Sequence, residues 1–141
     1  MITAWVPAAV AVSLFAAGCQ VASADPVAVG LDRDFTLGGG QEASVDGLRV
    51  RFADVLEDSR CPARVACFWS GQARLTVVVQ AEGDPPTTVA FNTNPAPGQG
   101  VSSGRAGEYT LTMRSLEPYP QTPEDATPFE DYRLTLSVAK G

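Results

Sequence analysis

The amino-acid sequence predicts an all-β protein, a small single-domain antiparallel β-sandwich or partly open barrel of about six to seven strands. Several short segments alternate apolar and polar residues with a period of two, as half-buried strands do. Turn-forming residues lie between these segments, and apolar residues nowhere recur at helical spacing over more than one turn. The outward-facing positions are mostly polar, which is typical of antiparallel sheets with one face in water.

The β pattern begins at Phe35 and continues almost to the end of the chain. Residues 48–52 alternate clearly, but Asp54 stands where the apolar face should continue, so we expect a β-bulge near Ala53 or Asp54. Further strands are expected at 73–81, 87–91, 109–114 and 132–138.

Turn residues and two long loops are expected to connect these strands. Gly38-Gly39-Gly40 and Asp46-Gly47 are typical of hairpin turns. One long loop is expected at 92–107, rich in proline, glycine and serine, and another at 117–131, which contains four prolines.

The domain organisation predicted is a leader at 1–24, a tether at 25–32 and a β-sandwich domain at 33–141. The apolar stretch at 6–17 is about 12 residues long, which matches a signal-peptide core, whereas a membrane-spanning helix needs about 20. Small residues then lead into Cys19, a pattern that resembles a bacterial lipobox, in which the cysteine is acylated and becomes the first mature residue. We therefore expect an exported protein that a lipid on Cys19 anchors to the cell envelope.

Two alternatives for the leader stay open. Ala22-Ser23-Ala24 has the small-x-small form of ordinary secretory cleavage, which would release a soluble protein beginning at Asp25. An uncleaved N-terminal anchor is the other alternative, because residues 1–24 carry no charged side chain. All three interpretations place the domain outside the cytoplasm.

The composition excludes several classes of function. A formal net charge of −6 without a lysine or arginine cluster argues against nucleic acid as a partner. The absence of histidine excludes Ser-His-Asp and Cys-His catalysis, His-ligated zinc and blue copper sites. No cofactor and no metal site are predicted, since the acidic residues also lack the spacing of a calcium loop.

Cys61 and Cys67 are an even pair if Cys19 is lipidated or removed with the leader. In an exported domain such a pair is expected to form a structural disulfide. The alternatives are weaker, because the spacing differs from the redox motif Cys-x-x-Cys and two cysteines without histidine supply too few zinc ligands.

The segment from Asp58 to Gly71 is the densest in unusual residues. It reads Asp-Ser-Arg-Cys-Pro at 58–62 and Cys-Phe-Trp-Ser-Gly at 67–71. This segment resembles an uncharacterised group of small exported bacterial proteins and lipoproteins, and the diffuse similarity extends over most of residues 35–139. The resemblance implies the fold and export, and it transfers no catalytic residue.

Three aromatic residues are candidates for binding. For Trp69, core packing beside the disulfide is the favoured interpretation, and stacking on a ligand is the alternative. Tyr119 and Phe129 lie in the proline-rich loop and either anchor a partner or, as we favour, fold back to cap the sandwich. Arg60 is expected to form a surface ion pair of little energetic weight with Asp58 or a strand carboxylate.

These observations predict a non-catalytic binding or structural module of the cell envelope, with an envelope protein or a glycan as partner. The membrane enters as a partner only through the lipid on Cys19. An alternative is a secreted inhibitor or accessory subunit of an envelope enzyme. A hydrolase that works through two carboxylates is the third hypothesis, because such pairs cleave glycosides.

Overall fold

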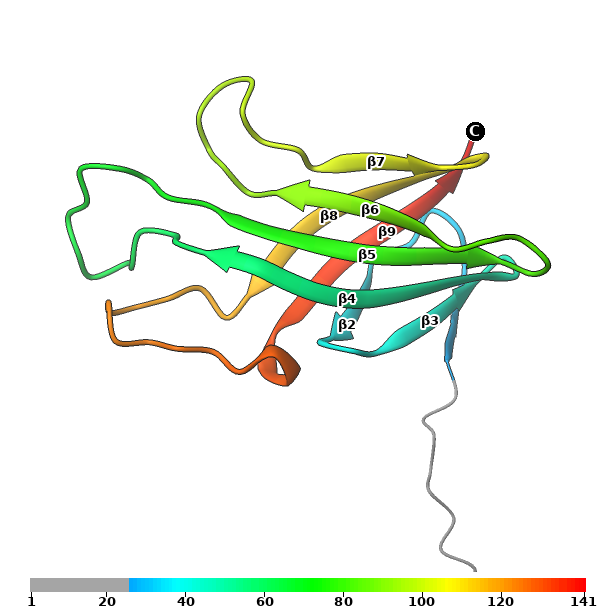
Figure 1. The fold of residues 1–141 in the computed structure, drawn as a ribbon, viewed down its shortest axis with the longest axis horizontal. Helices are drawn as coiled ribbons and strands as arrows, with labels where there is room; N and C mark the ends of the chain where they lie inside the picture. Colours follow the sequence, from blue (N-terminus) through cyan, green and yellow to red (C-terminus); the bar gives the residue numbers. More distant parts are fainter. Residues whose placement is uncertain (1–25) are drawn as a thin grey trace, which may run out of the picture.

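The computed structural model describes residues 26–141, which form two β-sheets packed face to face (Figure 1). The predictions for the leader, for Cys19 and for both cleavage sites lie outside the described residues. Within residues 26–141, no helix is long and apolar enough to cross a membrane. The elements of this part are β1 Val27–Val29, β2 Phe35–Gly38, β3 Glu42–Val45, β4 Leu48–Asp58, β5 Ala73–Ala81, β6 Thr87–Asn92, β7 Ser103–Ala106, β8 Tyr109–Glu117, the 3-10 turn η1 Phe129–Asp131 and β9 Arg133–Lys140.

The two sheets have the strand orders β1-β3-β4-β5-β6 and β2-β9-β8-β7. All pairs of neighbouring strands are antiparallel except β1 and β3, which are parallel. The predicted β-sandwich is confirmed, although the described residues form nine strands rather than the expected six to seven.

Two short strands account for most of this difference. β1 lies in the segment that was expected to be a tether, and β7 lies inside the loop expected at 92–107. Both are too short for a period of two to be recognised in the sequence. They become strands because longer neighbours pair with them, β3 with β1 and β8 with β7.

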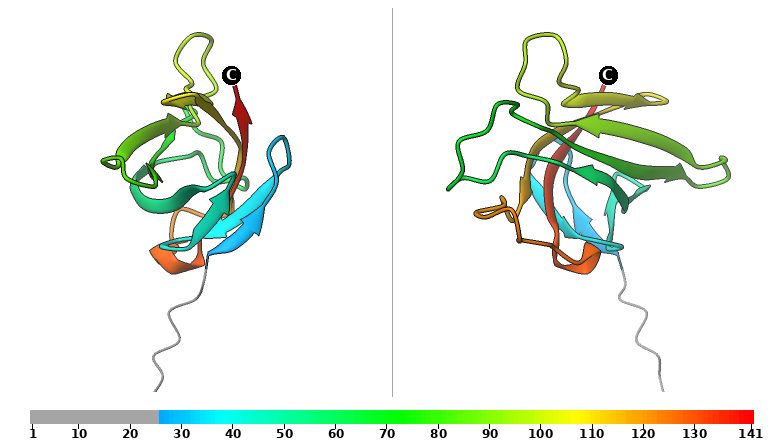
Figure 2. Two further views of the ribbon diagram at one scale, coloured as in Figure 1. Left: turned by 90° about the vertical axis from the view of Figure 1, so that its right-hand side faces the viewer. Right: turned by 60° about the vertical axis from the view of Figure 1, so that its left-hand side comes forward.

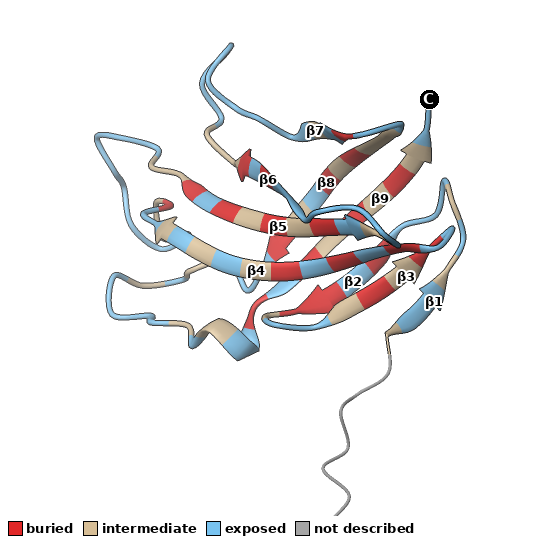
Figure 3. Ribbon diagram, turned by 45° about the vertical axis from the view of Figure 1, so that its right-hand side comes forward, coloured by how far each residue is buried: buried red, intermediate tan, exposed pale blue. Residues whose placement is uncertain are grey.

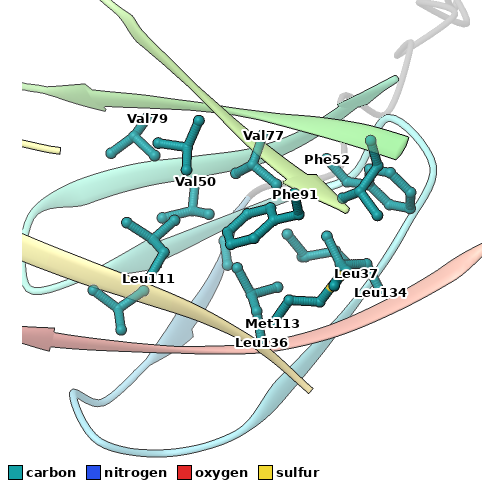
Figure 4. Packing of buried hydrophobic residues seen from close by; sticks show 14 of the residues in the cluster. Leu37, Val50, Phe52, Val77, Val79, Phe91, Leu111, Met113, Leu134 and Leu136 are labelled. Atoms are coloured by element: carbon teal, nitrogen blue, oxygen red, sulfur yellow. The ribbon is translucent and has the colours of Figure 1, made fainter. Parts of the chain in front are cut away.

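The hydrophobic core lies between the sheets, and alternate residues of the long strands fill it (Figure 3, Figure 4). Val50, Phe52, Val77 and Leu134 are completely buried, which confirms the inward faces predicted for these strands. The predicted bulge is also present, because the pairing of β4 with β5 shifts register after Phe52. Beyond the bulge, Leu56 of β4 points outward and is 53% exposed.

The two predicted hairpin turns have different outcomes. Asp46-Gly47 joins β3 to β4 with positive φ angles of 51° and 77°, as a two-residue hairpin turn requires. Gly38-Gly39-Gly40 does not form a hairpin, because it carries the chain from β2 in one sheet to β3 in the other. Here the backbone of Phe129 lies so close to Gly39 that a Cβ atom would overlap its carbonyl group.

Candidate functional site

The three longest connections between strands lie together at one end of the sandwich, where β4, β6 and β8 end and β5, β7 and β9 begin (Figure 1, Figure 2). We name this the loop end. It consists of the disulfide loop (59–72), the asparagine loop (93–102) and the proline-rich loop (118–132). Antiparallel pairing brings these segments together, although they are far apart in the sequence.

The disulfide loop is closed by the predicted bond between Cys61 and Cys67, whose Cα atoms are 6.0 Å apart. It returns to β5 through Gly71, which has a φ of 66° and lies so close to the carbonyl of Ser59 that a Cβ atom would overlap it. The Ser59 amide donates to the Gln72 carbonyl at 2.8 Å, which continues the β4–β5 pairing into the loop. The crosslink therefore sits on a backbone that is already hydrogen-bonded at its base.

Arg60 lies under the disulfide loop and is only 8% exposed. Its guanidinium donates one hydrogen bond to each carboxylate oxygen of Asp58, both at 2.8 Å. It also donates to the carbonyls of Leu116 and Pro118 at 2.7 and 2.9 Å, where β8 leads into the proline-rich loop. The predicted pair with Asp58 is confirmed, but its expected surface position was wrong, because both loops cover it.

Tyr132 completes this buried group by donating its hydroxyl to Asp58 at 2.7 Å. Burial would raise the pKa of Asp58, but hydrogen bonds from Arg60 and Tyr132 and the charge of Arg60 outweigh it and hold that pKa below its usual value. Burial and the hydrogen bond to Asp58 raise the pKa of Tyr132 to about 12. The Asp58 carboxylate is thus a structural acceptor that stays ionised near neutral pH.

Tyr119 and Phe129, the two predicted anchors, have different positions. The Tyr119 hydroxyl donates to the carbonyl of Cys61 at 2.7 Å, and the Arg60 guanidinium lies 5.1 Å from the centre of its ring. Phe129 packs edge-on against Phe52 in the core, with ring centres 5.3 Å apart. Phe129 therefore caps the sandwich, whereas Tyr119 supports the disulfide loop and is 42% exposed.

Trp69 does not pack in the core, contrary to the favoured interpretation. It is 78% exposed, and its neighbour Phe68 is 93% exposed. The two rings pack nearly perpendicular to each other, with centres 5.5 Å apart. The disulfide loop therefore presents an aromatic pair to solvent.

The asparagine loop is joined to the disulfide loop by amide side chains. The Gln72 side-chain oxygen accepts hydrogen bonds from Asn92 at 3.0 Å and from Asn94 at 3.3 Å. Thr93 also accepts a hydrogen bond from the backbone of Ala73, at 2.8 Å. The disulfide loop is thus hydrogen-bonded to both of the other loops of the loop end.

Two carboxylates, Asp58 and Asp125, line a pocket of about 330 Å³ beside the proline-rich loop. Asp125 accepts hydrogen bonds from the backbone amides of Gln121 and Thr122, which lower its pKa. Neither group has the raised pKa of a general acid, as carboxylate-based glycoside hydrolysis requires. Within residues 26–141, no group of three or more histidine, cysteine, aspartate or glutamate residues forms a potential metal site.

Sequence reasoning missed the burial of Arg60 and the amide cluster of Gln72, Asn92 and Asn94. The Asp-x-Arg spacing at 58–60 was an available signal for the first, since residues two apart in an extended chain point to the same side. The amide cluster has no local signal, because its members come from two separate segments. Comparisons with models of known families, with curated proteins and with solved structures found no match.

Proposed function

We propose that this protein is an exported module of the cell envelope, anchored by a lipid on Cys19. It binds a ligand through its loop end and does not catalyse a reaction on it. The exposure of Phe68 and Trp69 on a crosslinked loop carries this proposal. Aromatic side chains are enriched in binding interfaces, and adjacent exposed rings are unusual on a surface that has only to stay soluble.

The order of the loop end supports a role in recognition. The disulfide, the Arg60–Asp58 pair and the Tyr119 hydrogen bond already hold the disulfide loop in one conformation. A surface that is ordered before binding loses less conformational entropy when a ligand docks. Binding is favoured over hydrolysis because Asp58 and Asp125, the two carboxylates that line the pocket beside the proline-rich loop, are engaged in structural hydrogen bonds.

The test is binding to isolated cell envelopes. The full chain carries Cys19→Ser, which removes the lipid attachment, and is mixed with envelopes from cells of the same species that lack the gene. We expect the Cys19→Ser chain to sediment with the envelopes, and the added double change Phe68→Ser and Trp69→Ser to leave it in the supernatant. Because both side chains are exposed, the double change should alter the free energy of unfolding by less than about 0.5 kcal/mol.

The matched control is Val27→Ser, which also removes an exposed apolar side chain, 65% exposed, but from β1. This variant should sediment like the parent chain. Equal sedimentation of the parent and the double variant would contradict recognition through the aromatic pair.

The anchor is tested separately by mass spectrometry of the mature N-terminal peptide. We expect the mass of a peptide that begins at an acylated Cys19. A mature chain that begins at Asp25 would contradict the lipid anchor, but it would leave export and binding through the loop end in place.

A further inference from the structure

Trp69 borders a shallow pocket of about 340 Å³ on the loop end. The remaining lining residues are small or polar: Ser59, Ser70, Gly71, Gln72, Asn94 and Ala96. A flat indole therefore stands beside a surface of hydroxyl and amide groups. A ligand that fits this surface needs one apolar face and many hydrogen-bonding groups at its edge.

The amide groups of Gln72 and Asn94 are held in place and still have unused donors. The Gln72 NH2 group donates to Glu57 at 3.0 Å, and the Asn94 NH2 group donates to the Gln72 oxygen at 3.3 Å. Each NH2 group has two hydrogens, and the hydrogen bonds within residues 26–141 use one of them. One donor of each side chain is left for a ligand.

The charges near this pocket are neutralised by each other. Glu57, which accepts the hydrogen bond from Gln72, also accepts one from Arg74 at 3.0 Å, so Glu57 and Arg74 form an ion pair. The residues that line the pocket are all uncharged. Among residues 26–141, the lining of this pocket offers a phosphate or a carboxylate no unpaired cation, so the pocket suits a neutral ligand.

We propose that Trp69, Gln72 and Asn94 form a subsite for a neutral carbohydrate, in which one pyranose ring stacks on the indole while its hydroxyl groups bond to the two amides. This inference rests on the proposed function and specifies its ligand class. The axial C–H groups of a pyranose carry partial positive charge and are attracted to the negative face of the indole. The hydroxyl groups at the ring edge accept and donate hydrogen bonds, as side-chain amides do.

A membrane surface fits the same side chains less well. Insertion of the indole into a bilayer would bring Gln72, Asn94 and the Glu57–Arg74 pair toward the lipid and remove water from them. Burial of polar and charged groups without new partners is costly, whereas sugar hydroxyls replace the lost water.

The test measures the fluorescence of Trp69 in the full chain with Trp5→Phe, which makes Trp69 the only tryptophan. The probes are neutral oligosaccharides of glucose, mannose, galactose and N-acetylglucosamine. We expect a saturable change in emission with at least one series. Asn94→Ala should weaken that affinity about tenfold, because one hydrogen bond is lost. The matched control Gln80→Ala removes an exposed amide from the other end of β5 and should leave the affinity unchanged.

Calorimetry extends the test to Trp69→Ala, which has no indole signal and should show no binding. The inference is overturned if no series gives a saturable change, or if Asn94→Ala and Gln80→Ala bind alike. It is also overturned if vesicles of phosphatidylethanolamine and phosphatidylglycerol change the emission while the oligosaccharides do not. Envelope binding that depends on Phe68 and Trp69 but persists without any sugar response would reject the carbohydrate subsite and retain the proposed function.

Discussion

Each end of the sandwich has an aspartate that contacts a cationic side chain and a tyrosine, but the two groups differ in how far they are exposed to solvent. At the loop end, Asp58 binds Arg60 and Tyr132 beneath two loops. At the opposite end, which we name the turn end, Asp46 accepts a hydrogen bond from Tyr109 at 3.0 Å and lies 3.9 Å from the Lys140 ammonium group. The side chains of Arg60 and Asp58 are 7% and 16% exposed, whereas those of Lys140 and Asp46 are 52% and 44% exposed.

The connections at the two ends explain this difference. At the turn end the strands are joined by short segments, 46–47, 82–86 and 107–108, which need few contacts beyond their own turns. At the loop end the connections 59–72, 93–102 and 118–132 are long, and their backbone groups need partners beyond their own loop. Arg60 of the disulfide loop supplies such a donor to the carbonyl of Pro118 in the proline-rich loop, and it also bonds the carbonyl of Leu116 at the end of β8. An ion pair with a buried arginine thus bonds irregular backbone at the loop end, whereas the exposed Lys140–Asp46 pair lies beside a short turn.

The two ends should differ most in the free energy of unfolding that is lost when the cationic side chain, Arg60 or Lys140, is replaced. Arg60→Met leaves the part-buried Asp58 without its charge partner and two carbonyls without donors, so we expect a loss of about 2 to 4 kcal/mol in the free energy of unfolding. Lys140→Met, the matched change at the turn end, should cost less than about 1 kcal/mol. Urea denaturation of the full chain at neutral pH measures both.

Arg60→Lys sharpens this comparison, since lysine keeps the charge but cannot bond both oxygens of Asp58 and both carbonyls in the same planar geometry. Its stability should fall between those of the parent and Arg60→Met. Equal losses for Arg60→Met and Lys140→Met would mean that burial of the pair does not order the loop end.

Removal of the crosslink is expected to have a smaller effect. The double change Cys61→Ala and Cys67→Ala opens a loop of seven residues, for which chain entropy gives a loss of roughly 2 kcal/mol. Hydrogen–deuterium exchange should accelerate in the disulfide loop and stay unchanged in the turn at 46–47. Faster exchange at both ends would show that the disulfide stabilises the whole domain rather than the loop end.

The smallest of the three effects is expected for the tyrosine hydroxyl and depends on pH. Tyr132→Phe removes the hydrogen bond to the charged Asp58, at a cost of about 1.5 kcal/mol near neutral pH. The pKa of Tyr132 is raised from 10 to about 12 in the folded protein. The protonated hydroxyl therefore contributes stability that is fully present below pH 10 and is lost as the pH rises to about 12.

The difference in unfolding free energy between the parent and Tyr132→Phe should accordingly shrink between pH 10 and about 12. Tyr109→Phe is the control at the turn end, where the hydrogen bond to the exposed Asp46 raises the pKa of a half-buried tyrosine, and it should change stability less. A difference for Tyr132→Phe that is constant over this pH range would rule out the coupling to Asp58.

The sequence by itself determined the fold class and the inward faces of the long strands. Val50, Phe52, Val77 and Leu134 were assigned to the core from a period of two, which is a local property of extended backbone. The turn at Asp46-Gly47 and the disulfide were also predictable, because each depends on residues close together in the chain.

Only the tertiary structure decided which side chains the loops bury and which they expose. Arg60 and Trp69 are nine residues apart in one segment, and composition favoured the surface for the first and the core for the second. The structure reverses both, because the carbonyls of Leu116 in β8 and Pro118 in the proline-rich loop cover Arg60, whereas Trp69 remains 78% exposed. Burial in a long loop depends on which distant segment packs over it, and local patterning of apolar residues carries no information about that segment.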